Sequence, residues 1–74
     1  MAFDYNKLLG RMRERQITQE ALAALINNSP ATLSLKLNNK ARFKQAEIAT
    51  ICDKLEISPE DIGQYFFTLE VQKI

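Results

Sequence analysis

The stretch TQEALAALINNSPATLSLKLN, residues 18–38, decides the fold. Thr18 and Ser29 are favoured N-cap residues because their hydroxyls can accept a free backbone N–H of the first helical turn. Pro30 suits the first position of a helix, where no N–H is needed. Asn27 tolerates the left-handed backbone conformation that ends many helices. The stretch therefore predicts two short helices joined by a tight turn.

These two helices, expected at 18–26 and 29–37, form a helix-turn-helix pattern. Ala23 has to be small because the second helix crosses over it. Large apolar side chains have to point inward to hold this crossing, and they are Leu22, Ile26 and Leu33. The outward residues at the start of the second helix are then free to enter a major groove of DNA. The alternative is a helical hairpin with no role in DNA binding.

The rest of the chain also has helical signals. Apolar side chains recur at Tyr5, Leu8, Leu9 and Met12 with the spacing of one helix face. Phe43 with Ile48 fits a hydrophobic staple, and Glu47 fits a capping box if Lys44 is the N-cap. Ser58 and Pro59 start a short fifth helix that runs to about Tyr65. The expected fold is all-α, with five helices in one domain over residues 1–65.

Composition restricts the class of function. The chain has 74 residues, of which 46% are hydrophobic and 26% charged, as in an ordinary globular domain. It has no His and a single cysteine, Cys52, which excludes a disulfide within the chain and a Cys/His zinc site. The carboxylates at 53, 56, 60 and 61 lack the calcium-loop spacing and fit a solvated face. We therefore expect no enzyme, catalytic residue, metal, cofactor or small-molecule substrate.

We expect the chain neither to insert into a membrane nor to be secreted. The longest apolar run, residues 21–26, is far below the ~18 residues that cross a bilayer. The first residues lack the basic and apolar regions of a signal peptide. The chain is expected to be cytoplasmic.

Charge is divided unevenly along the sequence. Residues 5–44 hold eight Lys and Arg against two Glu, a net charge of +6, whereas residues 45–74 have a net charge of −4. A basic half is expected of a protein that meets a polyanion such as DNA. A random surface distribution in a short chain is the alternative.

In the tail, residues 66–74, the spacing of the apolar residues changes from a helical to an alternating pattern. Phe67, Leu69 and Val71 alternate with polar residues, which predicts an extended segment, with Phe66 on its other face. These four apolar side chains are expected to form a homodimer contact. The competing interpretation is that the tail folds back over its own helices and the protein stays monomeric.

Several motifs together resemble the Cro/C1-type helix-turn-helix family. They are Gln19-Glu20-x-Leu22-Ala23, then Ser29-x-x-Thr32-Leu33-Ser34-x-Lys36-Leu37-Asn38-Asn39-Lys40, then Phe43 and Ile48. The chain looks most like the small Cro-like regulators of temperate phages of Gram-positive bacteria. The resemblance implies a dimeric transcriptional repressor that binds operator DNA in the bacterial host cell.

The resemblance also implies which residues meet DNA. Gln19 is expected on a phosphate at the start of the first of the two helices. The groove-facing side of the second would carry Ser29, Pro30, Ala31, Thr32, Ser34 and Leu35. The backbone just beyond would be met by Lys36, Asn38, Lys40 and Arg42.

The groove-facing positions depart from the family pattern. They carry no Arg, Gln or Asn, the side chains that make bidentate contacts to bases. Ala31 and Leu35 offer methyl contacts only, and Leu35 is interpreted either as partly buried or as part of a protein-binding surface. The second functional hypothesis is therefore a protein-interaction module on the same fold, a modulator or antirepressor that binds another repressor.

Overall fold

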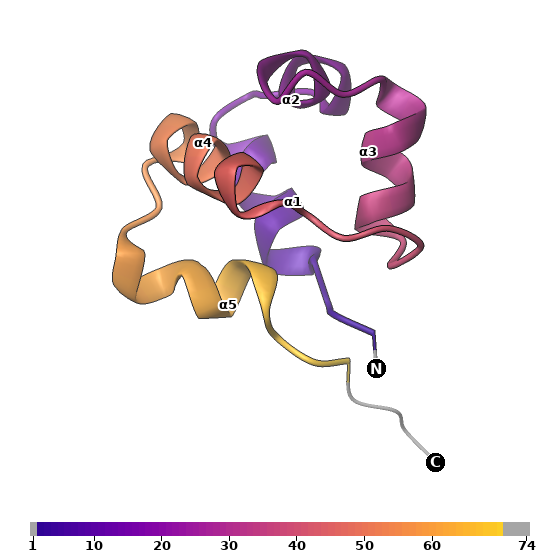
Figure 1. Cartoon of the computed structure of the whole chain (residues 1–74). Helices are drawn as coiled ribbons and strands as arrows, with labels where there is room; N and C mark the ends of the chain where they lie inside the picture. Colours follow the sequence, from indigo (N-terminus) through magenta and orange to yellow (C-terminus); the bar gives the residue numbers. More distant parts are fainter. Residues whose placement is uncertain (1, 71–74) are drawn as a thin grey trace.

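The computed structural model describes residues 2–70 and contains five α-helices, as predicted (Figure 1). In chain order they are α1 (Asn6–Glu14), α2 (Gln19–Leu25), α3 (Pro30–Leu37), α4 (Gln45–Leu55) and α5 (Ile62–Phe66). A single 3-10 turn, Pro59–Asp61, precedes α5 where the sequence predicted the start of an α-helix. Within the described residues no strand longer than an isolated bridge occurs.

The helix-turn-helix forms as its sequence signals predict. The Thr18 hydroxyl accepts the Ala21 N–H at 3.1 Å, and the Ser29 hydroxyl accepts the Thr32 N–H at 3.1 Å. Asn27 has φ of 56°, the left-handed value that ends α2 and turns the chain toward α3. Short-range hydrogen-bonding chemistry therefore places both helix starts and the turn between them.

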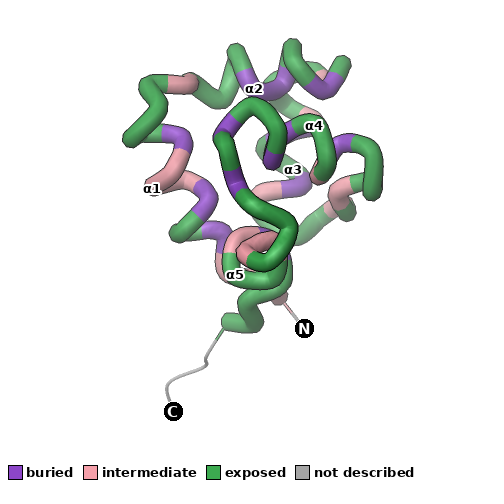
Figure 2. The backbone as a smooth tube through the Cα atoms, turned by 90° about the vertical axis from the view of Figure 1, so that its left-hand side faces the viewer, coloured by how far each residue is buried: buried purple, intermediate pink, exposed green. Residues whose placement is uncertain are grey.

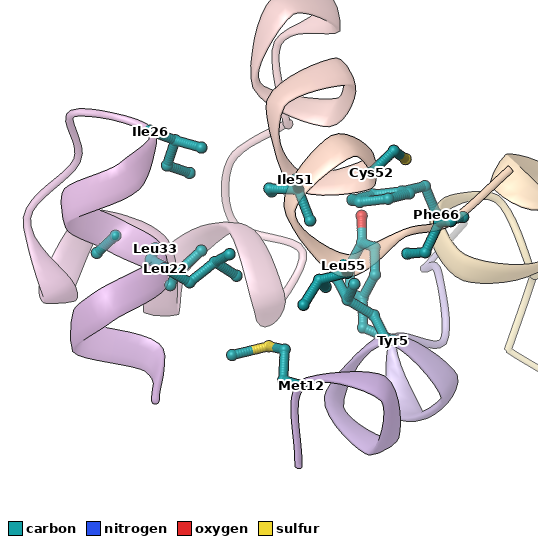
Figure 3. Close-up of a cluster of buried hydrophobic side chains, with 12 residues drawn as sticks. Tyr5, Met12, Leu22, Ile26, Leu33, Ile51, Cys52, Leu55 and Phe66 are labelled. Atoms are coloured by element: carbon teal, nitrogen blue, oxygen red, sulfur yellow. The ribbon is translucent and has the colours of Figure 1, made fainter. Parts of the chain in front are cut away.

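One apolar core joins all five helices (Figures 2 and 3). Its largest fully buried side chains are Phe66, Leu8, Leu22, Leu33, Ile51 and Leu55. Ala23 is 0% exposed where α2 and α3 pack together, as the crossing requires. Burial of each large apolar side chain contributes roughly 1.5–3 kcal/mol, so this core is the main source of stability.

Phe66 was predicted in the extended tail as part of a homodimer contact, and this prediction is wrong. Its side chain is 1% exposed and lies in the core at the end of α5 (Figure 3). The reason is that α5 continues through residue 66, so this side chain follows the helical period of the domain and not the alternation of the tail.

The tail pairs with the start of its own chain. Phe3 and Leu69 form an antiparallel bridge, in which Asp4 N–H donates to the Thr68 carbonyl at 2.7 Å and Glu70 N–H donates to the Ala2 carbonyl at 3.0 Å. Residues 2–4 and 68–70 therefore lie side by side (Figure 1). Of the predicted dimer contacts, Phe67 and Leu69 remain exposed, and Val71 lies outside the described residues. Dimerisation stays a prediction.

We expect the change Ala23→Leu to destabilise the domain strongly. Three extra carbons at the α2–α3 crossing have no space, and overpacking costs ~1–3 kcal/mol out of the ~5–15 kcal/mol that stabilise a typical domain. Urea unfolding followed by circular dichroism measures the decrease in stability. Ala24→Leu is the matched control because Ala24 is exposed one residue further along α2. Equal stability of the two variants would contradict close packing at Ala23.

Candidate interaction surface on helix α3

Helix α3 presents an exposed side that holds most of the residues predicted to meet DNA. On α3 and its N-cap the exposed residues are Ser29, Pro30, Ala31, Ser34 and Leu35, while Thr32 is half-buried. Gln19 is exposed at the start of α2, and the residues after α3 that are exposed are Asn38, Lys40 and Arg42. The structure therefore places the exposed residues of α3 on one side of a short helix.

The polar groups of this side are occupied by contacts within the helix. The Ser29 and Thr32 hydroxyls lie 2.9 Å apart and share a hydrogen bond, in addition to the Ser29 cap. The Asn38 amide donates to the Ser34 carbonyl at 2.8 Å and contacts its hydroxyl at 3.3 Å. Groups that read base edges by hydrogen bonding are therefore scarce on α3.

Two small or mid-sized apolar residues of α3, Ala31 and Leu35, face solvent. Leu35 is 46% exposed, and Ala31, one turn earlier on the helix, is exposed as well. This exposure favours the second of the two interpretations of Leu35, a protein-binding surface, over partial burial in the core. An exposed leucine on a helix with internally bonded polar groups is suited to bury apolar area against another protein.

Lys36 was predicted beside the DNA backbone, and the structure places it elsewhere. Its side chain is buried, 5% exposed, and contacts α4, whereas the neighbouring Leu35 is exposed. The ammonium Nζ contacts Glu47 Oε1 at 2.6 Å and Oε2 at 2.7 Å, and donates to Asn28 Oδ1 at 2.7 Å. With all of these partners inside the protein, Lys36 has no free donor for a phosphate.

Glu47 and Asn28 complete this buried network. Glu47 accepts the Lys44 backbone N–H at 2.9 Å and the Asn28 amide at 2.9 Å. Sequence reasoning placed Glu47 at the start of α4 correctly but missed its partner on α3. The burial of Lys36 could have been predicted from its position in the sequence. Lys36 follows the buried Leu33 by three residues and so shares its side of the helix.

The environment of Glu47 lowers its pKa. Burial by itself raises the pKa of this carboxyl, but hydrogen bonds from Lys36, from the Lys44 backbone and from Asn28, together with the Lys36 charge, outweigh it and hold the pKa at about 2, below the ordinary 4.5. Glu47 is therefore a carboxylate at neutral pH, paired with the Lys36 ammonium.

Other groups carry little chemistry. Cys52 is buried in the core, and this burial raises the pKa of its thiol, as expected of an inert core cysteine. Across residues 2–70 no cluster of three or more His, Cys, Asp or Glu side chains is arranged to hold a metal ion. In the same range, none of the helices is long and apolar enough to cross a membrane.

Comparison with known proteins identifies the family to which the chain belongs. The family described as "Protein of unknown function (DUF739)" matches residues 1–69, so the chain belongs to it. The Cro/C1-type family is not shown by the comparisons, and the resemblance to it remains a prediction. No curated protein matches the chain.

A solved structure is similar over nearly the whole chain. It is the solution structure of the modulator of repression (MOR) of the temperate bacteriophage TP901-1 from Lactococcus lactis. The two sequences are 42% identical, the match covers 97% of each chain, and the TM-score is 0.75. The chain is thus related to a phage regulatory protein with the same small helical fold.

We expect the Lys36–Glu47 pair to make the fold sensitive to acid. Because the pKa of Glu47 is lower in the folded state, its contribution to stability is complete above pH 4.5 and disappears as the pH falls toward 2. Loss of one charge of a buried ion pair typically costs roughly 3–5 kcal/mol. Thermal unfolding between pH 7 and pH 2 measures the decrease in stability.

The variant Glu47→Gln should be less stable at neutral pH and should not show the steep part of this pH profile, since no carboxyl remains to titrate. Glu60→Gln, which changes an exposed carboxylate in the 3-10 turn, is the control. If wild type and Glu47→Gln decline in parallel between pH 4.5 and pH 2, the pair is not the source of the acid sensitivity.

Proposed function

We propose that the chain is a modulator of repression, which acts by binding another repressor protein through the exposed side of helix α3. The observation that carries the proposal is the chemistry of that side: Leu35 is 46% exposed and Ala31 is exposed as well. The Ser29 and Thr32 hydroxyls bond to each other, and the Asn38 amide donates to the Ser34 carbonyl. Such a surface gains more from burial against a protein than from contact with base edges.

The similarity to a modulator of repression supports the same conclusion. The identity of 42% over 97% of each chain supports a regulatory role for this chain as well. Contact with a repressor through the exposed side of α3 is our proposal for how that role is carried out.

A three-component assay tests this function. The repressor encoded in the same genome is bound to its operator duplex, and the full chain is added. We expect the chain to change operator occupancy only when the repressor is present, and to leave the bare operator unshifted. Specific binding of the chain alone to the operator would overturn the proposal.

Sequence-specific DNA binding is the second candidate function. It is favoured by the exposed cations that follow α3, Lys40, Arg42 and Lys44, beside a helix that is free of other elements on its outer side. In this case, too, the weak hydrogen-bonding capacity of α3 implies that phosphate contacts supply most of the affinity.

We expect Leu35→Asp to weaken binding to the repressor by about tenfold or more, because it places a charge at the centre of an apolar contact. The fold should be unaffected, since the side chain is exposed. Isothermal titration calorimetry measures the affinity. Leu25→Asp is the control, because Leu25 is also exposed, at 39%, but lies on α2. A larger effect for Leu25→Asp than for Leu35→Asp would move the contact away from α3.

For DNA, we expect the double change Lys40→Ala with Arg42→Ala to weaken binding to specific and random duplexes alike. Log affinity decreases as log salt concentration rises, and removal of a single phosphate contact makes this decrease less steep by ~0.9. A salt series with both duplexes measures the slope. An unchanged slope would remove these two cations from any DNA interface.

A further inference from the structure

A groove lies between the ends of the chain and the loop that joins α3 to α4. Its volume is about 400 Å³, at the lower end of the ~300–1,000 Å³ range of ligand pockets. Its apolar walls are Phe3, Tyr5, Phe43, Ile48, Phe66 and Phe67. A groove of this size has room for one or two side chains of a peptide.

The aromatic rings of the groove form a continuous series of contacts, in which Phe3 and Tyr5 meet at a tilt, with centroids 6.4 Å apart at 56°. Phe67 packs on Phe3 with ring centroids 5.8 Å apart at 84°, and Tyr5 packs on Phe43 at 5.5 Å and 74°. Phe43 in turn meets the buried Phe66 at 5.4 Å and 83°. Because each ring fixes the next, most of the wall is formed before any ligand enters. Phe67, 53% exposed, is the outermost ring.

The Phe3 wall is held by a side chain from the α3–α4 loop. Asn39, with φ of 63°, accepts the Phe3 N–H at 2.8 Å and donates its amide to the Phe3 carbonyl at 2.9 Å. Asn39 therefore uses its polar atoms to position the groove and not to hold a ligand.

Arg42 is the one charged group on this groove, judged over residues 2–70. Its side chain is exposed, no carboxylate pairs with it in that part of the chain, and the groove lining contains no acidic residue. Lys40 and Lys44, on either side of it in sequence, are exposed cations as well. An anionic group bound here would meet no repulsion from the lining.

We propose that this groove is a second docking site, which takes a segment of a partner protein that carries a large apolar side chain next to a carboxylate. The apolar side chain enters among the aromatic rings, and the carboxylate pairs with the planar guanidinium of Arg42, which matches it in a bidentate contact. The site is separate from the exposed side of α3 and does not depend on the function proposed for that side.

The test uses the full chain and a minimal probe, the peptide acetyl-Phe-Glu-amide, with acetyl-Phe-Gln-amide as the uncharged control. Binding is followed by amide chemical shifts in nuclear magnetic resonance spectra. We expect the Glu peptide to shift Phe3, Phe43 and Phe67, with a dissociation constant on the order of 1 mM. The Gln peptide should bind at least about threefold more weakly.

Variants of Arg42 and Phe67 test the charged part and the apolar part of the groove separately. Arg42→Gln should remove the preference for the Glu peptide, whereas Phe67→Ala should weaken both peptides by about threefold or more. Arg13→Gln is the matched control, because Arg13 is an exposed arginine on α1 that does not line this groove. Phe67 and Arg42 are exposed, so these variants should remain folded.

Three results would overturn the proposal. The first is that neither peptide shifts the groove residues. The second is that the Glu and Gln peptides bind equally and Arg42→Gln changes nothing. The third is that the same resonances move with protein concentration alone, because the occupant would then be a second copy of this chain.

Discussion

The ion pair between Lys36 and Glu47 is the contact on which the placement of α3 depends. It joins α3 to the start of α4, and Asn28 adds the turn between α2 and α3 to the same network. Two charges taken out of water are costly unless their partners are complete. Here the ammonium and both carboxylate oxygens have partners, so the cost is offset only when α3 lies in this one position. An apolar contact in the same place would tolerate small rotations of the helix.

This fixed position determines which residues α3 turns toward solvent. With Lys36 and Leu33 committed to the interior, Ala31 and Leu35 are turned outward. The orientation of the exposed leucine is thus linked to the charges on the buried side of the same helix.

Much of the fold was predictable because its signals are local. The caps at Thr18 and Ser29 and the left-handed Asn27 depend on side chains within three residues of the groups they satisfy. Lys36 and Phe66 were misplaced for the opposite reason. The partner of Lys36 lies eleven residues away on another helix, and the burial of Phe66 depends on how far α5 extends. On the candidate site, the exposure of Leu35 also needed the three-dimensional arrangement, since the sequence allowed either side.

The pairing of Phe3 with Leu69 has a kinetic consequence. It closes the longest loop in the described chain, at an entropic cost that rises with loop length, and is stabilised by two backbone hydrogen bonds. The helix-turn-helix, by contrast, needs only contacts between near neighbours in sequence. We therefore expect the helices to form early in folding and the Phe3–Leu69 pairing to form last. For the same reason we expect this pairing to separate before any helix does, so that the amides of residues 4 and 70 exchange with solvent faster than those of the core.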